Sequence, residues 1–201
     1  AAWTELVTDD DIVIIAGDIS WGLKLDEAMA DLEWIHELPG QKVLLRGNHD
    51  LWWCRIQYLR TLYDDMHFLQ NDCYYVEALD LAICGSRGWP TPDTVSYTEH
   101  DEKMYLREQG RLRNSLVEAK KKGASKIIMA MHYPPAKVEE TEFTRVMQEY
   151  GVTQCVYGHL HGMVAWTNGI KGEHGGIDYK LVSLDYLGAK PKLIYDSEQE
   201  M

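Results

Sequence analysis

An α/β fold is predicted by the spacing of hydrophobic residues along this chain of 201 residues. Short continuous apolar runs, which are typical of buried strands, alternate with longer stretches whose apolar residues recur every three or four positions, as on one face of a helix. Hydrophobic residues make up 45% of the sequence and only six residues are proline, so the chain can bury a sizeable core. We expect one domain over residues 1–201, with a C-terminal third rich in strands.

Two strands separated by a helix are expected near the N-terminus. Residues 11–16 (DIVIIA) and 42–45 (KVLL) are short apolar runs that are closely followed by glycine, as expected for buried strands. Residues 25–37 place their apolar side chains on one helical face, and the pair Pro39-Gly40 ends that helix.

Further elements follow in the same alternation. Residues 53–63 have a helical pattern, and the apolar runs 73–79 and 81–85 predict a strand pair around a turn at Asp80.

The second half of the chain opens with the longest expected helix, residues 98–122. Three lysines close this helix just before Gly123, where the helix dipole favours cations and glycine favours termination. Residues 126–131 (KIIMAM) and 155–157 (CVY) are expected strands, with a short helix over 143–150 between them.

The net charge and the cysteine content exclude some classes of function for this protein. The net charge of −12 argues against a partner that is an extended nucleic acid, because such proteins neutralise phosphates with clustered Lys and Arg. Four scattered cysteines without CxxC spacing fit reduced thiols in a cytosolic protein. No apolar run approaches the ~18 residues of a membrane span, and no signal peptide is visible. We expect a cytoplasmic protein without a membrane partner; the sequence does not indicate its oligomeric state.

Several expected strands end in a small residue that is followed by a metal-ligand type. These residues are, in chain order, Asp18, Asn48, His49, His132, His159 and His161. Because the carboxyl ends of the strands in an open α/β sheet face one crevice, the segments are expected to converge. A mixture of oxygen and imidazole ligands suits Mn, Fe, Zn, Co or Ni, and a carboxylate such as that of Asp18 can bridge two ions. Two such ions clamp a phosphoryl group and activate water.

The motif series resembles that of the calcineurin-like metallophosphoesterases. The motifs are GD at 17–18, GNHD at 47–50, an isolated His132 and GHLH at 158–161, and their order and spacing match across nearly the whole chain. The strings IIAGDISWGL, LPGQKVLLRGNHDLWW and AICGSRGW also resemble a bacterial subgroup of predicted phosphohydrolases that brings no known substrate. The resemblance implies a four-layer α-β-β-α sandwich of two mixed sheets flanked by helices. It also implies hydrolysis of phosphate mono- or diesters by water activated on two divalent transition-metal ions.

The resemblance also implies a role for each motif residue. Asp18 would bridge the two ions, while Asn48, His132 and His159 would complete one metal site and His161 would belong to the other. His49 would stand over the phosphate and protonate the leaving oxygen. Asp50 would accept a hydrogen bond from His49 and so orient it.

One family motif is missing. The family's first motif, Asp-x-His, should precede residues 14–18 by some tens of residues, and the chain contains no such pattern. Either the sequence lacks its natural N-terminus or this member has lost one metal site. We favour the first explanation, because the missing strand would normally lie centrally in the sheet and its loss would expose strand edges.

Three function hypotheses therefore remain: a binuclear hydrolase, a mononuclear phosphodiesterase, and a non-catalytic protein that uses the same fold as a binding or scaffolding surface. The expected substrate of the enzyme is a phosphorylated small molecule or nucleotide. Arg87 and Trp89 either line the rim of the pocket or belong to a structural loop. Arg46 either contacts phosphate or forms a salt bridge.

Overall fold

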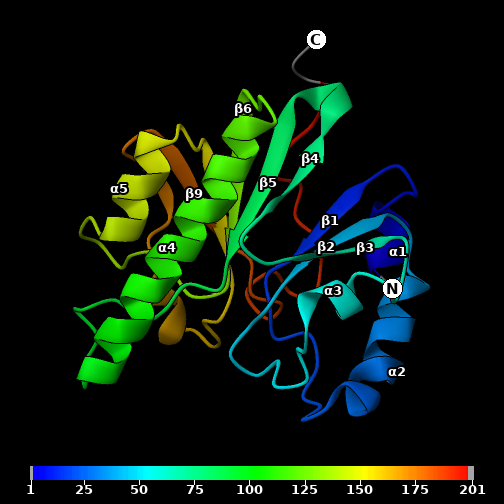
Figure 1. Cartoon of the computed structure of the whole chain (residues 1–201), viewed down its shortest axis with the longest axis horizontal. Helices are drawn as coiled ribbons and strands as arrows, with labels where there is room; N and C mark the ends of the chain where they lie inside the picture. Colours follow the sequence, from blue (N-terminus) through cyan, green and yellow to red (C-terminus); the bar gives the residue numbers. More distant parts are fainter. Residues whose placement is uncertain (1, 199–201) are drawn as a thin grey trace.

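The computed structural model describes residues 2–198 and contains two stacked sheets with helices on their outer faces (Figure 1). Its helices are α1 (Ala2–Leu6), α2 (Leu25–His36), α3 (Ile56–Leu59), α4 (Glu99–Lys121) and α5 (Glu142–Glu149). Its strands are β1 (Ile12–Ile15), β2 (Gln41–Leu45), β3 (Met66–Leu69), β4 (Cys73–Val76), β5 (Leu81–Ser86), β6 (Lys126–Met131), β7 (Gln154–Tyr157), β8 (Gly172–His174) and β9 (Ile177–Leu181). Short 3₁₀ turns cover Glu77–Leu79 and Ala165–Asn168.

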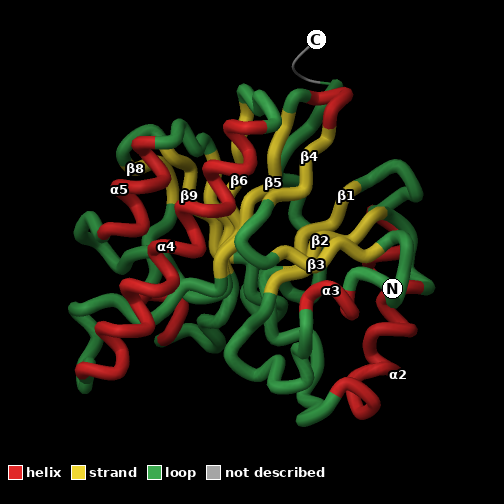
Figure 2. Tube along the Cα trace, viewed as in Figure 1, coloured by secondary structure: helices red, strands yellow, loops and turns green. Residues whose placement is uncertain are grey.

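The two sheets, whose strands are yellow in Figure 2, differ in the direction of their strands. The smaller sheet has the order β1-β2-β3 and is parallel throughout. The larger has the order β4-β5-β6-β7-β9-β8, in which β4 and β8 run antiparallel to their neighbours and the four strands between them are parallel. The expected α/β sandwich is confirmed, with the refinement that only the larger sheet is mixed.

Alternating side chains of β2 show how the layers pack. Leu44 points outward into a core that it shares with α2, whereas Val43 and Leu45 point toward the larger sheet. There Val43 packs with Ile83, and Leu45 packs with Ala130 and Val156 in a second contact between the sheets. Strands covered on both faces are continuous apolar runs, which is why the run KVLL reads as a buried strand.

The largest core lies between the larger sheet and helices α4 and α5. Met129 and Met131 of β6 face this side, together with Leu112 and Leu116 of α4 and Phe143 of α5. In Figure 1, α4 and α5 cover the outer face of the larger sheet while α2 and α3 lie beside the smaller one. The four layers are therefore helix, sheet, sheet and helix. No helix within residues 2–198 has both the length and the apolar character needed to cross a membrane.

The segment after the GNHD motif differs from expectation. The predicted helix over 53–63 is wrong except for α3, and the strand β3 was not predicted. Trp52 donates its indole N–H to the Asp50 carboxylate, at 3.0 Å, and Trp53 packs edge-on against Phe68 of β3. These contacts hold the backbone in tight turns, so the helix begins only at Ile56. The expected strand over 73–79 likewise ends at Val76 and continues as a 3₁₀ turn.

Candidate metal centre

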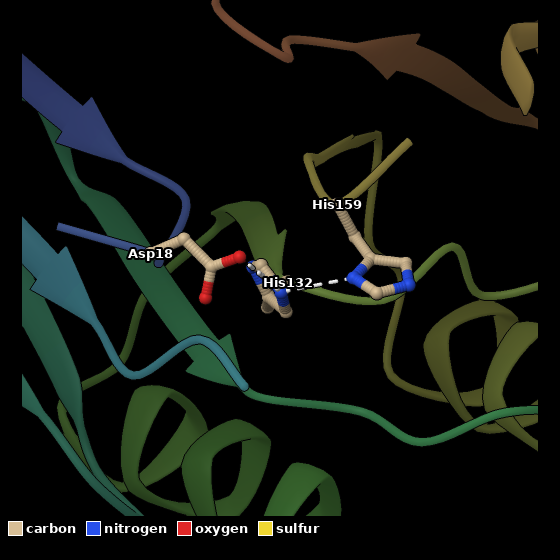
Figure 3. Close-up of side chains that lie close together, drawn as sticks. All are labelled: Asp18, His132 and His159. Carbon is tan, nitrogen blue, oxygen red and sulfur yellow. Dashed lines mark hydrogen bonds and ion pairs between the residues drawn. The ribbon is translucent and has the colours of Figure 1, made fainter. Parts of the chain in front are cut away.

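The carboxyl ends of four parallel strands meet where the two sheets touch. Asp18 follows β1, Asn48 follows β2, His132 directly follows β6 and His159 follows β7. The structure brings these four side chains together, as the convergence of parallel strands at one edge predicts. Figure 3 shows His132 between the Asp18 carboxylate and the His159 ring.

The ligand atoms lie close enough to share one cation. Nε2 of His132 lies 2.6 Å from Oδ1 of Asn48 and 3.5 Å from Oδ2 of Asp18. Nδ1 of His159 lies 2.9 Å from the same Asn48 oxygen and 3.2 Å from His132 Nε2. One ligand atom each from Asp18, His132 and His159 fits within a span of 4.8 Å.

The tautomer of His132 shows why this cluster fits a metal ion. The Nδ1 atom of His132 lies 2.8 Å from the Ala16 carbonyl oxygen, which can only accept, so Nδ1 carries the proton. Burial lowers the pKa of His132, which keeps the ring neutral and leaves a lone pair on Nε2. That lone pair faces the Asn48 and Asp18 oxygens. Electron-rich atoms that face one another are what a cation requires, and a backbone carbonyl on the far nitrogen is a common way to orient a histidine ligand.

Burial also disfavours protonation of His159. Its pKa falls to about 4, chiefly through burial and then through the neighbouring His132. A neutral imidazole is the form that binds metal. With nitrogen ligands from His132 and His159 and oxygen ligands from Asp18 and Asn48, the donor set fits a divalent transition metal better than Ca²⁺ or Mg²⁺.

The backbone at the cluster is held in an unfavourable conformation. Asp18 has φ of 56° and His159 has φ of 67°, in the left-handed region that residues with a side chain seldom adopt. Such conformations cost of order 1–3 kcal/mol each and persist where the surrounding structure fixes them. At Asp18 the fixing group is the carboxylate of Asp50.

Asp50 is fully buried and accepts hydrogen bonds from five donors. Four are backbone N–H groups and the fifth is the Trp52 indole. The donors are Asp18 N at 2.8 Å, Ile19 N at 2.8 Å, Ser20 N at 3.1 Å, Gly47 N at 2.7 Å and Trp52 Nε1 at 3.0 Å. Asp50 therefore ties the Asp18 loop to the GNHD loop. Within the described residues the His49 ring is not among the donors to this carboxylate, so the orienting role of Asp50 toward His49 stays a prediction.

The His49 ring is exposed and lies against Trp21 in a tilted arrangement, with ring centroids 4.2 Å apart. Its backbone N–H donates to Oδ1 of Asp18 at 2.8 Å. The main chain of His49 thus orients the Asp18 carboxylate, while its imidazole is free to face a ligand beside the cluster. Sequence reasoning did not find Trp21, which is 75% exposed and has no signal beyond its place in the GDISWG string.

His161 lies outside the cluster. Its ring is exposed, and Nδ1 lies 3.0 Å from Oδ1 of Asp185. The other oxygen of Asp185 accepts from Gly162 N at 2.8 Å. Sequence reasoning missed Asp185, a single carboxylate in the C-terminal segment. The role of His161 in a second metal site stays a prediction.

Gly47 allows the Asp18 carboxylate to take its place, and Gly47→Ala is expected to displace it. A Cβ atom at residue 47 would lie 2.1 Å from Oδ1 and 2.2 Å from the backbone N of Asp18. We expect a loss of about 1–3 kcal/mol of folding stability from this overpacking, measured by urea unfolding, together with weaker Mn²⁺ binding.

Gly110→Ala is the matched control for Gly47→Ala. Apart from the backbone of its own helix, no atom of the described residues lies within 4 Å of a Cβ at residue 110, in the interior of α4. This substitution should therefore stabilise the protein slightly. Equal effects at the two glycines would contradict the steric argument.

Comparisons with known proteins agree with this geometry. The family model described as calcineurin-like phosphoesterase matches residues 2–163. The chain is also 49% identical over 49 residues to the Gene 66 protein of Mycobacterium phage L5, in an alignment that covers 24% of this chain and 23% of the phage protein. The match thus spans about a quarter of the length of that relative.

Proposed function

Because the chain belongs to the calcineurin-like phosphoesterase family, we propose that it is a metal-dependent phosphohydrolase that cleaves phosphate mono- or diesters. The observation that carries the proposal is the meeting of Asp18, Asn48, His132 and His159 at one edge of the two sheets. Histidines with lowered pKa values beside a carboxylate are typical of functional sites, which favours the enzyme over the non-catalytic alternative.

In this proposal each residue has a definite task. The two imidazoles, the Asn48 amide oxygen and the Asp18 carboxylate would hold the cation. A divalent metal, when bound, supplies positive charge to phosphoryl oxygens and lowers the pKa of water. Mn²⁺, Fe, Zn²⁺, Co²⁺ and Ni²⁺ all suit this donor set. His161 would serve a second ion of the dinuclear centre that is typical of the family.

His49 would act on the leaving group. Its main chain is fixed by the hydrogen bond to Asp18, and its exposed ring rests on Trp21 beside the cluster. A protonated imidazole there would neutralise charge on the phosphate and give a proton to the departing oxygen. The substrate would be a phosphorylated small molecule or nucleotide, which an acidic protein can accept where a cation supplies local positive charge.

His159→Ala tests the proposal. The variant is expected to lose Mn²⁺ binding by more than tenfold and to lose hydrolysis of p-nitrophenyl phosphate and bis-p-nitrophenyl phosphate, because it removes a metal ligand. Binding is measured by isothermal titration and turnover by release of p-nitrophenol.

His174→Ala is the matched control for His159→Ala. His174 is exposed on the edge strand β8; its ring lies 3.0 Å from the Lys171 carbonyl and beside the ring of Tyr179. This variant should keep both metal and activity. A wild-type protein that binds Mn²⁺ but hydrolyses neither ester would favour the binding or scaffolding alternative.

A further inference from the structure

Two arginines emerge at the same sheet edge as the metal-binding cluster. Arg46 directly follows β2, two residues before Asn48, and Arg87 directly follows β5. The Arg87 carbonyl accepts from Tyr133 N at 3.0 Å, so Arg87 is anchored beside the residue that follows His132. Both side chains are half-buried.

Neither guanidinium has a carboxylate partner within the described chain. Arg46 donates from Nε only to the backbone carbonyl of Asp50, at 3.2 Å. The Nε of Arg87 is buried and unpartnered, and its guanidinium lies over the Trp89 ring at 4.5 Å. The buried carboxylates of Asp50 and Glu108 attract Arg46, and that of Glu108 also attracts Arg87. The Asp50 carboxylate is bound by five other donors and Glu108 by Arg111 at 2.7 Å, so neither forms a salt bridge with Arg46 or Arg87.

This arrangement is electrostatically unbalanced. Burial lowers the pKa of both arginines, and the two groups are close enough to repel each other. A partly buried cation without a partner is costly, and an anion between two such cations would relieve the cost. The chain as a whole carries a charge of −12, so two neighbouring arginines without a salt-bridge partner in the described chain differ from the general trend.

Aromatic rings connect Arg87 to the metal-binding cluster. Trp89 lies 5.8 Å from Tyr133, and Tyr133 lies 4.2 Å from the ring of His159. The guanidinium that lies over Trp89 is thus linked, through Tyr133, to both histidines of the cluster. An anion bound there would be a neighbour of a phosphoryl group held at the cluster.

We propose that Arg46 and Arg87 form a subsite for a second oxyanion of the substrate, a phosphate or a carboxylate, beside the phosphoryl group that is cleaved. Arginine presents a planar fork that matches both oxyanions through two parallel hydrogen bonds. The proposal rests on the proposed function, and it narrows the substrate class to phosphate esters that carry a further anionic group.

The first test measures binding without metal or turnover. Protein treated with EDTA is titrated with inorganic phosphate by isothermal titration calorimetry. Wild type is expected to bind phosphate, and Arg87→Gln to weaken binding by about tenfold or more, since a charge-assisted contact is lost. Arg55→Gln removes the same charge from an exposed arginine and should bind like wild type. Equal binding by all three proteins, or no binding by wild type, would overturn the subsite.

The second test compares KM values for three substrates in the Mn²⁺-loaded enzyme. The substrates are propyl phosphate, 3-phosphooxypropanoate and propane-1,3-diol bisphosphate, which differ only in the group at the far end. Wild type should have a lower KM for the charged substrates, and the one with the lower KM identifies the oxyanion. We define the KM ratio as the KM for propyl phosphate divided by the KM for the preferred charged substrate. In Arg87→Gln this ratio should fall toward one, and an unchanged ratio would contradict the proposal.

Two further variants separate misfolding from loss of the subsite. Arg87→Lys keeps a positive charge without the fork and should give an intermediate ratio. Arg46→Gln should also lower the KM ratio toward one. Circular dichroism checks the fold of each variant. An inactive wild type with intact, Arg87-dependent phosphate binding would mean that the subsite exists and the proposed hydrolysis fails.

Discussion

Asp50→Ala is expected to destabilise the protein by at least about 4 kcal/mol and to abolish Mn²⁺ binding. The substitution leaves four backbone N–H groups and the Trp52 indole without their acceptor. A buried donor that loses its partner costs ~1–3 kcal/mol, and the costs of such neighbours are not strictly additive. Without its anchor, the strained backbone of Asp18 should relax and withdraw the carboxylate from the cluster. Urea unfolding and isothermal titration with Mn²⁺ measure the two effects.

Asp10→Ala serves as the control for Asp50→Ala, because Asp10 is exposed and its loss should change stability by less than ~0.5 kcal/mol. The outcome also separates two roles for Asp50. If Asp50 mainly oriented His49, Asp50→Ala would keep its stability and its metal while changing only the pH dependence of turnover. Wild-type stability in Asp50→Ala would contradict the role assigned here.

His49→Ala should reduce turnover by ~10²–10⁴-fold, the contribution typical of a general acid. The same variant should leave the Mn²⁺ affinity unchanged. The ring lies outside the cluster, and alanine keeps the backbone N–H that donates to Asp18. The loss should be larger for phenyl phosphate than for p-nitrophenyl phosphate, because p-nitrophenolate departs with little need of a proton. Steady-state kinetics on the two esters provides the comparison.

An equal loss on both esters would argue that His49 stabilises charge on the phosphate without giving a proton. Loss of metal together with activity would show that the ring is part of the metal site, against the geometry. The variant thus distinguishes the two tasks proposed for His49.

Residues that emerge from strand ends were predictable from sequence. Asp18, Asn48, His132 and His159 follow apolar runs, and the parallel arrangement brings such ends together whatever the details of packing. The elements β6 and α4 were also predictable from sequence. A continuous apolar run indicates a buried strand, and lysines followed by glycine indicate the end of a helix.

Features that depend on tertiary contacts were not predictable. The five donors of Asp50 are mostly backbone groups, which have no signature in a sequence. The residues of β3, Met66–Leu69, are too few to show a period, and they form a strand because β2 offers an unpaired edge. The pairing of His161 with Asp185 likewise joins segments 24 residues apart that no local pattern relates.

The central claim is that one divalent cation binds between Asp18, Asn48, His132 and His159. Anomalous X-ray diffraction from crystals soaked in Mn²⁺ tests it most directly. We predict an anomalous peak within coordination distance, ~2.0–2.3 Å, of Asp18 Oδ2, Asn48 Oδ1, His132 Nε2 and His159 Nδ1. A peak at another place, or none at this cluster at saturating Mn²⁺, would contradict the account.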